Sequence, residues 1–79
     1  MSTAIKQVAV RRFGEKVKQL RERRGMTHAE LAVALGYASS SYISLLENGK
    51  RGANAELVRK VSLLFQVSAD DLLDDAREV

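Results

Sequence analysis

The sequence predicts a single all-α domain of five short helices. Three observations support this fold class: apolar residues recur at helical spacing, capping residues and glycines bound the segments, and no segment has the alternation of a strand. The chain has 79 residues and neither proline nor cysteine. This length fits one domain with a modest core. The cysteine count excludes disulfides, thiolate zinc sites and a thiol nucleophile.

The first helix is predicted from Phe13 onward. Phe13, Val17 and Leu20 follow the i, i+4, i+7 spacing of one helix face. Gly25 is expected to end the helix, because glycine adopts a left-handed conformation at low cost. Residues 1–12 are expected to form an N-terminal extension that continues this helix.

The second helix has a strong start signal. Thr27 and Glu30 are spaced as a capping box, in which each side chain bonds the backbone N–H of the other residue. The helix is expected to run from His28 to about Leu35 and to stop at Gly36.

Three further helices complete the expected fold, and serines suited to N-capping precede two of them. Their expected bounds are Ser40 to about Asn48 after the cap Ser39, about Asn54 to Phe65, and a short helix from Ser68 to near Ala76. The domain is therefore expected to span residues 13–76, and residues 77–79 form an acidic C-terminal end.

The net charge of +3 is unevenly distributed. Residues 1–65 carry twelve Lys and Arg against five Asp and Glu, whereas residues 66–79 carry one Arg against five acidic residues. A basic body with an acidic end favours a polyanionic partner on one side of the molecule. The alternative is a solvated surface of mixed charge.

The second and third helices, joined at Gly36, have the features of a helix-turn-helix. A small residue in the turn lets the two helices cross. The third helix carries its apolar residues Ile43 and Leu46 on one side only. Outward serines such as Ser40 and Ser41 are short enough to approach base edges in a major groove about 12 Å wide.

Two runs in this region extend the pattern: Thr27-His28-Ala29-Glu30-Leu31-Ala32 with Leu35-Gly36, and Tyr42-Ile43-Ser44 with Leu46-Glu47-Asn48-Gly49-Lys50-Arg51. They resemble the XRE family of phage-repressor and Cro-like regulators, which includes restriction–modification controller proteins and antitoxins. The resemblance covers about residues 13–73 and implies a compact, five-helix, lambda-repressor-like DNA-binding domain. The chain departs from the family at His28, usually Gln, at Ala53, usually Pro, and by one added residue between Gly36 and Ser39.

The resemblance also implies which residues contact DNA. Those expected at base edges are Ser40, Ser41, Tyr42, Ser44 and Leu45. Those expected at phosphates are Thr27, His28, Ser39, Asn48, Lys50, Arg51 and Arg24. Arg21 and Glu47 match a pair that ties the first helix to the third, and we interpret them as a structural ion pair.

Each contact residue has a plainer alternative, a solvated surface position. For Arg24 the phosphate and solvent interpretations are evenly balanced. His28 is not expected to bind metal or act in catalysis, because no second ligand or nucleophile is spaced to join it.

Apolar residues left over on the last two helices predict a two-fold dimer. The expected interface residues are Leu57, Leu63, Leu64, Leu73 and Ala76. Two recognition helices about 34 Å apart would address a palindromic operator. The alternative is that some of these leucines pack on an extended first helix through Ile5 and Val8.

The expected function is sequence-specific binding of double-stranded DNA by a dimeric transcriptional regulator, such as a repressor. The alternative is an antitoxin-like module that binds a toxin or another protein, with DNA binding secondary. No phosphate-binding loop, dinucleotide loop or paired-carboxylate pattern occurs, so we expect no enzymatic activity, cofactor or metal. No apolar run suits a signal peptide or the ~20 residues of a membrane span, so a cytoplasmic location is expected.

Overall fold

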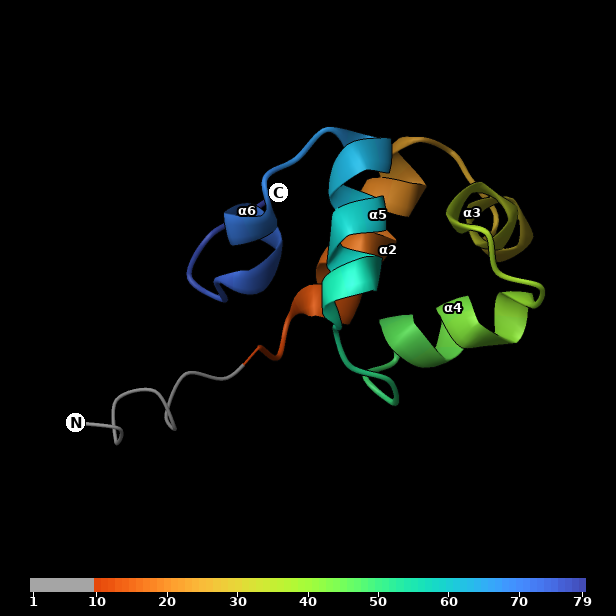
Figure 1. Cartoon of the computed structure of the whole chain (residues 1–79), viewed down its shortest axis with the longest axis horizontal. Helices are drawn as coiled ribbons and strands as arrows, with labels where there is room; N and C mark the ends of the chain where they lie inside the picture. The colour runs from red at the N-terminus through yellow and green to blue at the C-terminus, as the bar shows by residue number, and fades with distance from the viewer. Residues whose placement is uncertain (1–9) are drawn as a thin grey trace.

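The helices surround a shared core, with the helix-turn-helix on one side. The computed structural model describes residues 10–79, which contain five helices and no strand. In chain order the helices are α2 (Phe13–Arg23), α3 (His28–Leu35), α4 (Ser40–Glu47), α5 (Ala55–Phe65) and α6 (Ala69–Leu73). In the view of Figure 1, α3 and α4 lie to the right of α2 and α5, and α6 lies to the left. Within these residues the predicted all-α, five-helix fold is confirmed.

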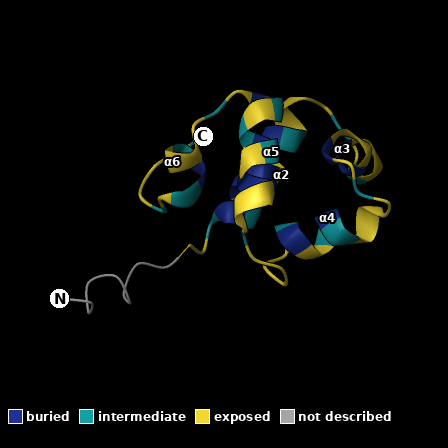
Figure 2. Ribbon diagram, in the orientation of Figure 1, coloured by how far each residue is buried: buried dark blue, intermediate teal, exposed yellow. Residues whose placement is uncertain are grey.

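Every helix contributes apolar side chains to one core. Figure 2 shows buried and exposed residues alternating along the helices, as expected for amphipathic helices. The core residues are Phe13, Val17 and Leu20 of α2, Leu31, Ala32 and Leu35 of α3, Ile43 and Leu46 of α4, Leu57, Val58, Val61 and Phe65 of α5, and Leu72 of α6. Five of these residues were predicted from helical spacing, namely Phe13, Val17, Leu20, Ile43 and Leu46.

The N-caps follow the local sequence closely. Thr27 Oγ1 accepts from the N–H of Glu30 at 3.0 Å, and the Glu30 carboxylate accepts from the N–H of Thr27 at 2.8 Å. The predicted capping box is therefore confirmed. Ser68 Oγ likewise accepts from the N–H of Asp71, but the Asp71 carboxylate bonds Arg77 at 2.8 Å, so this second cap is one-sided.

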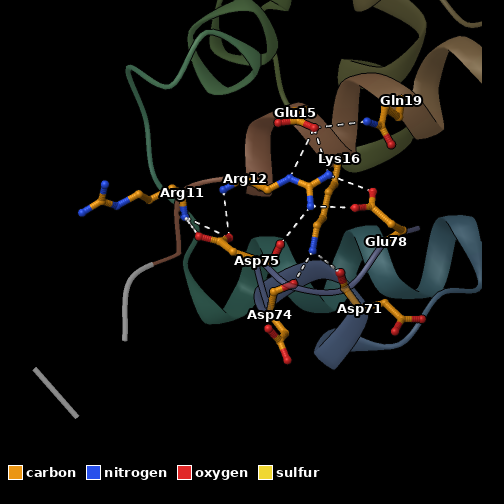
Figure 3. Close-up of polar contacts among 9 residues, drawn as sticks. All are labelled: Arg11, Arg12, Glu15, Lys16, Gln19, Asp71, Asp74, Asp75 and Glu78. Atoms are coloured by element: carbon orange, nitrogen blue, oxygen red, sulfur yellow. Dashed lines mark hydrogen bonds and ion pairs between the residues drawn. The ribbon is translucent and has the colours of Figure 1, made fainter. Parts of the chain in front are cut away.

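The last helix is shorter than expected. It ends at Leu73 instead of near Ala76, because Asp74 has extended backbone angles, φ −86° and ψ 112°. The chain turns there, and the residues that follow run back toward the start of α2 (Figure 3).

The expected helical extension before Phe13 does not include residues 10–12, which are not helical. The N–H groups of Arg11 and Arg12 donate to the carboxylate of Asp75, at 3.0 to 3.1 Å. Contacts with the far end of the chain therefore direct its entry into α2. The expectation for residues 1–9, which include Ile5 and Val8, lies outside the described residues.

Residues 74–79, here called the C-terminal latch, are attached to α2 by charged groups (Figure 3). Arg12 donates two hydrogen bonds to Glu78, at 2.8 and 2.9 Å, and a third to the carbonyl of Asp75. The guanidinium of Arg12 lowers the pKa of Glu78, and the N–H groups of Arg11 and Arg12 lower the pKa of Asp75. The acidic C-terminal end is thus bonded to the start of the first described helix.

Lys16 makes a second, buried contact between α2 and the end of α6. Its side chain is fully buried, and Nζ donates to the carbonyls of Asp71 and Asp74, at 2.5 and 2.7 Å (Figure 3). These carbonyls lie at the end of α6, where a helix leaves acceptors without intrahelical partners. One ammonium group on α2 therefore satisfies the end of a helix that is distant in sequence.

Candidate nucleic-acid interface

The turn between α3 and α4 is built from Gly36 and a pair of tyrosines. Gly36 has φ +82°, a left-handed conformation that suits glycine. The N–H of Tyr37 then donates to the carbonyl of Ala32 at 2.8 Å. The rings of Tyr37 and Tyr42 pack with centroids 4.7 Å apart, and burial raises the pKa of Tyr37. This stacking joins the turn to α4.

Helix α4 has one buried and one solvent-facing side. Ile43 and Leu46 are fully buried, whereas Ser40 and Ser41 are exposed. Leu45 is 38% exposed. Ser39, the N-cap, accepts from the N–H of Ser41 at 3.1 Å, and Ser44 is half-buried. The helix thus presents small polar side chains to solvent at its N-terminal end, with one leucine further along.

Tyr42 differs from the other residues expected at base edges. It is half-buried against Tyr37, whose other contacts include the ammonium group of Lys60, 4.9 Å from the ring centroid. Tyr42 therefore has a packing role in the turn, whatever its hydroxyl contacts.

Arg21 and Glu47 form a bidentate ion pair that joins α2 to α4. Arg21 Nε donates to Glu47 Oε2 at 2.7 Å, and Nη2 donates to Oε1 at 3.1 Å. The side chains of Arg21 and Glu47 are 11% and 4% exposed. His28 Nε2 lies 3.1 Å from the same Glu47 Oε1. One buried carboxylate therefore links the first residue of α3 to both α2 and α4.

The other residues expected at phosphates lie around the two helix ends. Thr27 and Ser39 are exposed N-caps, and their hydroxyls already accept backbone N–H groups. Asn48, exposed at the end of α4, donates to Ser44 Oγ at 3.4 Å. Lys50 and Arg51 are exposed in the following loop and form no ion pair with another side chain among residues 10–79.

Arg24, the C-cap of α2, contacts the end of another helix. Its guanidinium lies 5.1 Å from the ring centroid of Phe65 and donates to the carbonyl of Leu64 at 3.3 Å. These contacts are with the C-terminal end of α5 and not with α3 or α4. Arg24 is nevertheless exposed, so its expected phosphate contact stays a prediction.

The expected dimer residues do not form one surface. Leu57 is fully buried in the core of its own chain, so its assignment to an interface is wrong. The N-cap Asn54 orients the first turn of α5 and directs Leu57 inward, with Asn54 Oδ1 accepting the N–H of Leu57 at 2.9 Å.

The remaining four residues divide between two sides of α5. Leu63, 64% exposed, and half-buried Leu64 border a hollow that α3 also lines. Leu73 and Ala76 lie on the α6 side, beside Val10.

Two residues that position the helices were not predicted. Lys16 lies outside the Phe13, Val17, Leu20 spacing, and nothing local signals its burial. Gly14 lies where α2 approaches α4, and a Cβ there would be 2.0 Å from the carbonyl oxygen of Leu46. A glycine inside an apolar helical pattern is the one local signal that could have indicated this close approach.

Within residues 10–79 no group of three or more His, Cys, Asp or Glu side chains is arranged to hold a metal ion. No helix in that part of the chain is both long and apolar enough to cross a membrane.

The fold and the α3–α4 geometry define a helix-turn-helix protein. Residues 12–76 match the family model described as a helix-turn-helix domain, and the chain belongs to this family. The resemblance to XRE-type regulators found in the sequence is confirmed.

The curated relatives are named as transcriptional regulators. The HTH-type transcriptional activator BcrR of Enterococcus faecalis is 41% identical over 61 residues, which cover 77% of this chain and 29% of the relative. The HTH-type transcriptional regulator SinR of Bacillus subtilis is 34% identical over 66 residues, which cover 84% of this chain and 60% of the relative. RghRB of the same species, described as an uncharacterized HTH-type transcriptional regulator, is 34% identical over 68 residues. These cover 85% of this chain and 48% of the relative. This chain thus spans less than two thirds of each relative's length. No solved structure gives a significant match.

Proposed function

We propose that this chain binds double-stranded DNA sequence-specifically as a transcriptional regulator, with α4 in the major groove. The observation that carries the proposal is the outer side of α4. It presents Ser40 and Ser41 to solvent, while the Arg21–Glu47 pair and the buried residues hold its inner side. Membership of the helix-turn-helix family and the names of the relatives support the same function.

The proposed base contacts come from the exposed side of α4. Serine hydroxyls donate or accept, and Leu45 suits the methyl group of thymine. We assign base contact to Ser40, Ser41, Ser44 and Leu45, and an edge contact to the Tyr42 hydroxyl.

The proposed phosphate contacts surround this helix. They are Thr27, His28, Ser39, Asn48, Lys50 and Arg51, together with the exposed Arg24, whose guanidinium contacts the end of α5 in the absence of DNA. A dimer that makes about 6–10 phosphate contacts would lose about 10³–10⁵ in affinity between 50 and 200 mM salt.

The functional form in this proposal is a two-fold dimer on a palindromic operator. We place the interface on the α6 side of α5, where Val10, Ala69 and Leu73 border a largely apolar groove. Ala76 borders the adjoining hollow, which charged side chains also line. Sedimentation should show a dimer that Leu73→Glu disrupts. Leu63→Glu is the matched control, because Leu63 lies on the α3 side. A Leu73→Glu variant that remains dimeric would contradict this placement.

A protein partner is the second candidate function. Val33 and Leu63 are 77% and 64% exposed and border one hollow between α3 and α5. Two large apolar side chains together at the surface are typical of interaction sites. If a partner is the main target, Leu63→Glu should abolish partner binding and leave DNA binding intact.

Selection from a random duplex library tests the main proposal. The protein should enrich one sequence, and Ser41→Ala should change that preference. Lys50→Ala should weaken binding to selected and random DNA alike, because phosphate contacts carry no sequence information. No enrichment, together with an affinity independent of salt, would refute DNA binding.

A further inference from the structure

His28 and Glu47 form a contact whose chemistry restricts how the histidine can bind a phosphate. Within residues 10–79, the ring of His28 has one hydrogen-bond partner, Glu47 Oε1, at 3.1 Å from Nε2. The side chain of Glu47 is only 4% exposed, whereas that of His28 is 44% exposed. The inner nitrogen of the ring is therefore engaged, and the ring itself remains accessible.

The proton positions follow from the partners. An ionised carboxylate only accepts hydrogen bonds, so Nε2 must carry a proton when it bonds Glu47. A neutral imidazole has one N–H, which leaves Nδ1 as an acceptor. A phosphate oxygen is also an acceptor, and Nδ1 can donate to it only when the ring is protonated and cationic.

The local charge balance favours this cationic state in a DNA complex. Glu47 faces the guanidinium of Arg21 as well as His28, so a protonated ring gives two cations on one carboxylate. A DNA phosphate would supply the missing negative charge. On the neighbouring elements, the carboxylate of Glu22 lies 3.9 Å from Arg21, and the carboxylate of Glu30 bonds the N–H of Thr27.

We propose that Glu47 is a positioning residue that directs His28 Nδ1 to a DNA phosphate, so that DNA binding takes up a proton at His28. The proposal rests on the proposed DNA-binding function. It gives the histidine at this position a property that the amide of a glutamine lacks, since an amide donates hydrogen bonds at any physiological pH.

The test is the pH profile of DNA affinity, measured by fluorescence anisotropy with the selected duplex at fixed ionic strength. Between about pH 8 and pH 6, where histidine side chains ordinarily titrate, wild-type affinity should rise as pH falls. The rise in affinity is limited to about tenfold per pH unit for each proton that binding takes up. His28→Gln should lose this slope and bind more weakly than wild type at the acidic end.

Calorimetry in buffers of different ionisation enthalpy measures directly how many protons are taken up on DNA binding, and it needs no variant of Glu47. Wild type should take up protons on binding, and His28→Gln should take up fewer. Glu47→Gln, if folded, should also take up fewer, because the carboxylate that orients and favours the cationic ring is gone. If Glu47→Gln does not fold, the comparison of wild type with His28→Gln decides whether the histidine is the proton acceptor.

The outcomes separate this inference from the proposed function. Salt-dependent, sequence-specific binding with the same pH slope in wild type and His28→Gln would overturn the proton linkage and leave DNA binding standing. A folded Glu47→Gln variant with unchanged proton uptake would overturn the role of Glu47. No DNA binding by wild type at any pH would overturn the proposed function, and the proton linkage with it.

Discussion

Gly14→Ala tests the close contact between α2 and α4. A Cβ at this position would lie 2.0 Å from the carbonyl oxygen of Leu46 and 3.2 Å from the Cα of Glu47. Both neighbours are backbone atoms of the α4 end, so no side chain can rotate away. Helices α2 and α4 must separate by on the order of 1 Å to restore an ordinary contact distance.

The expected loss follows from what that separation opens. Val17, Leu20, Ile43 and Leu46 are at most 6% exposed and belong to the same core. Overpacking at such a contact typically costs about 1–3 kcal/mol, and alanine regains up to about 1 kcal/mol in helix propensity. We expect a net loss of about 1–2 kcal/mol, which lowers the melting temperature of a domain this size by roughly 4–16 °C.

Urea and thermal unfolding followed by circular dichroism provide the measurement, with two other glycines as controls. At Gly52 a Cβ would meet no atom within 4 Å, and φ is not positive, so Gly52→Ala should be neutral or stabilising by up to about 1 kcal/mol. Gly25 has equally open space but φ +65°, so Gly25→Ala reports backbone strain alone. If Gly14→Ala were as stable as Gly52→Ala, the close approach would not constrain the packing of α4.

Three further predictions concern charged groups. Lys16→Met should cost roughly 1–3 kcal/mol, because it leaves two carbonyls at the end of α6 without their donor, whereas Lys18→Met on the exposed side should be near neutral in the same urea titration. Arg21→Ala and Glu47→Ala should each lower the free energy of unfolding by about 3–5 kcal/mol. The double variant should lose less than the sum of the two single losses. Strict additivity in this double-mutant cycle would show that the pair is not coupled. Because the pKa of Glu78 is lowered in the folded state, its contribution to stability is present above the ordinary carboxyl pKa and is lost as pH falls through the lowered value. The melting temperature should therefore fall on acidification below about pH 5, and by less in Glu78→Gln. Equal falls would exclude Glu78 as the cause.

Local sequence determined the helices, because capping and helical spacing act within one or two turns. Thr27 and Glu30 are three residues apart, and their capping box forms as predicted. Gly36 ends α3 in the left-handed conformation that the turn needs. The outward serines of α4 follow from the same periodicity, since Ile43 and Leu46 define the side that must be buried.

Tertiary structure decided how the ends of the chain are used. Asp75 and Glu78 lie more than sixty residues from Arg12 in sequence, yet they bond it and the backbone beside it. An excess of acidic residues near the C-terminus predicts a negative charge there, but it does not predict which basic residue will bond these carboxylates. Only the docking of α6 against α2 brings these groups together, and it also buries Lys16.

The same distinction separates Leu57 from Leu63. Both are leucines of α5, which has more apolar residues than one buried face needs. The sequence analysis assigned both leucines to a dimer surface. In the structure Leu57 is fully buried and Leu63 is 64% exposed. Periodicity determines the angle between two side chains around a helix axis, but the direction of the core is determined by where the neighbouring helices pack, and that depends on contacts between residues far apart in the chain.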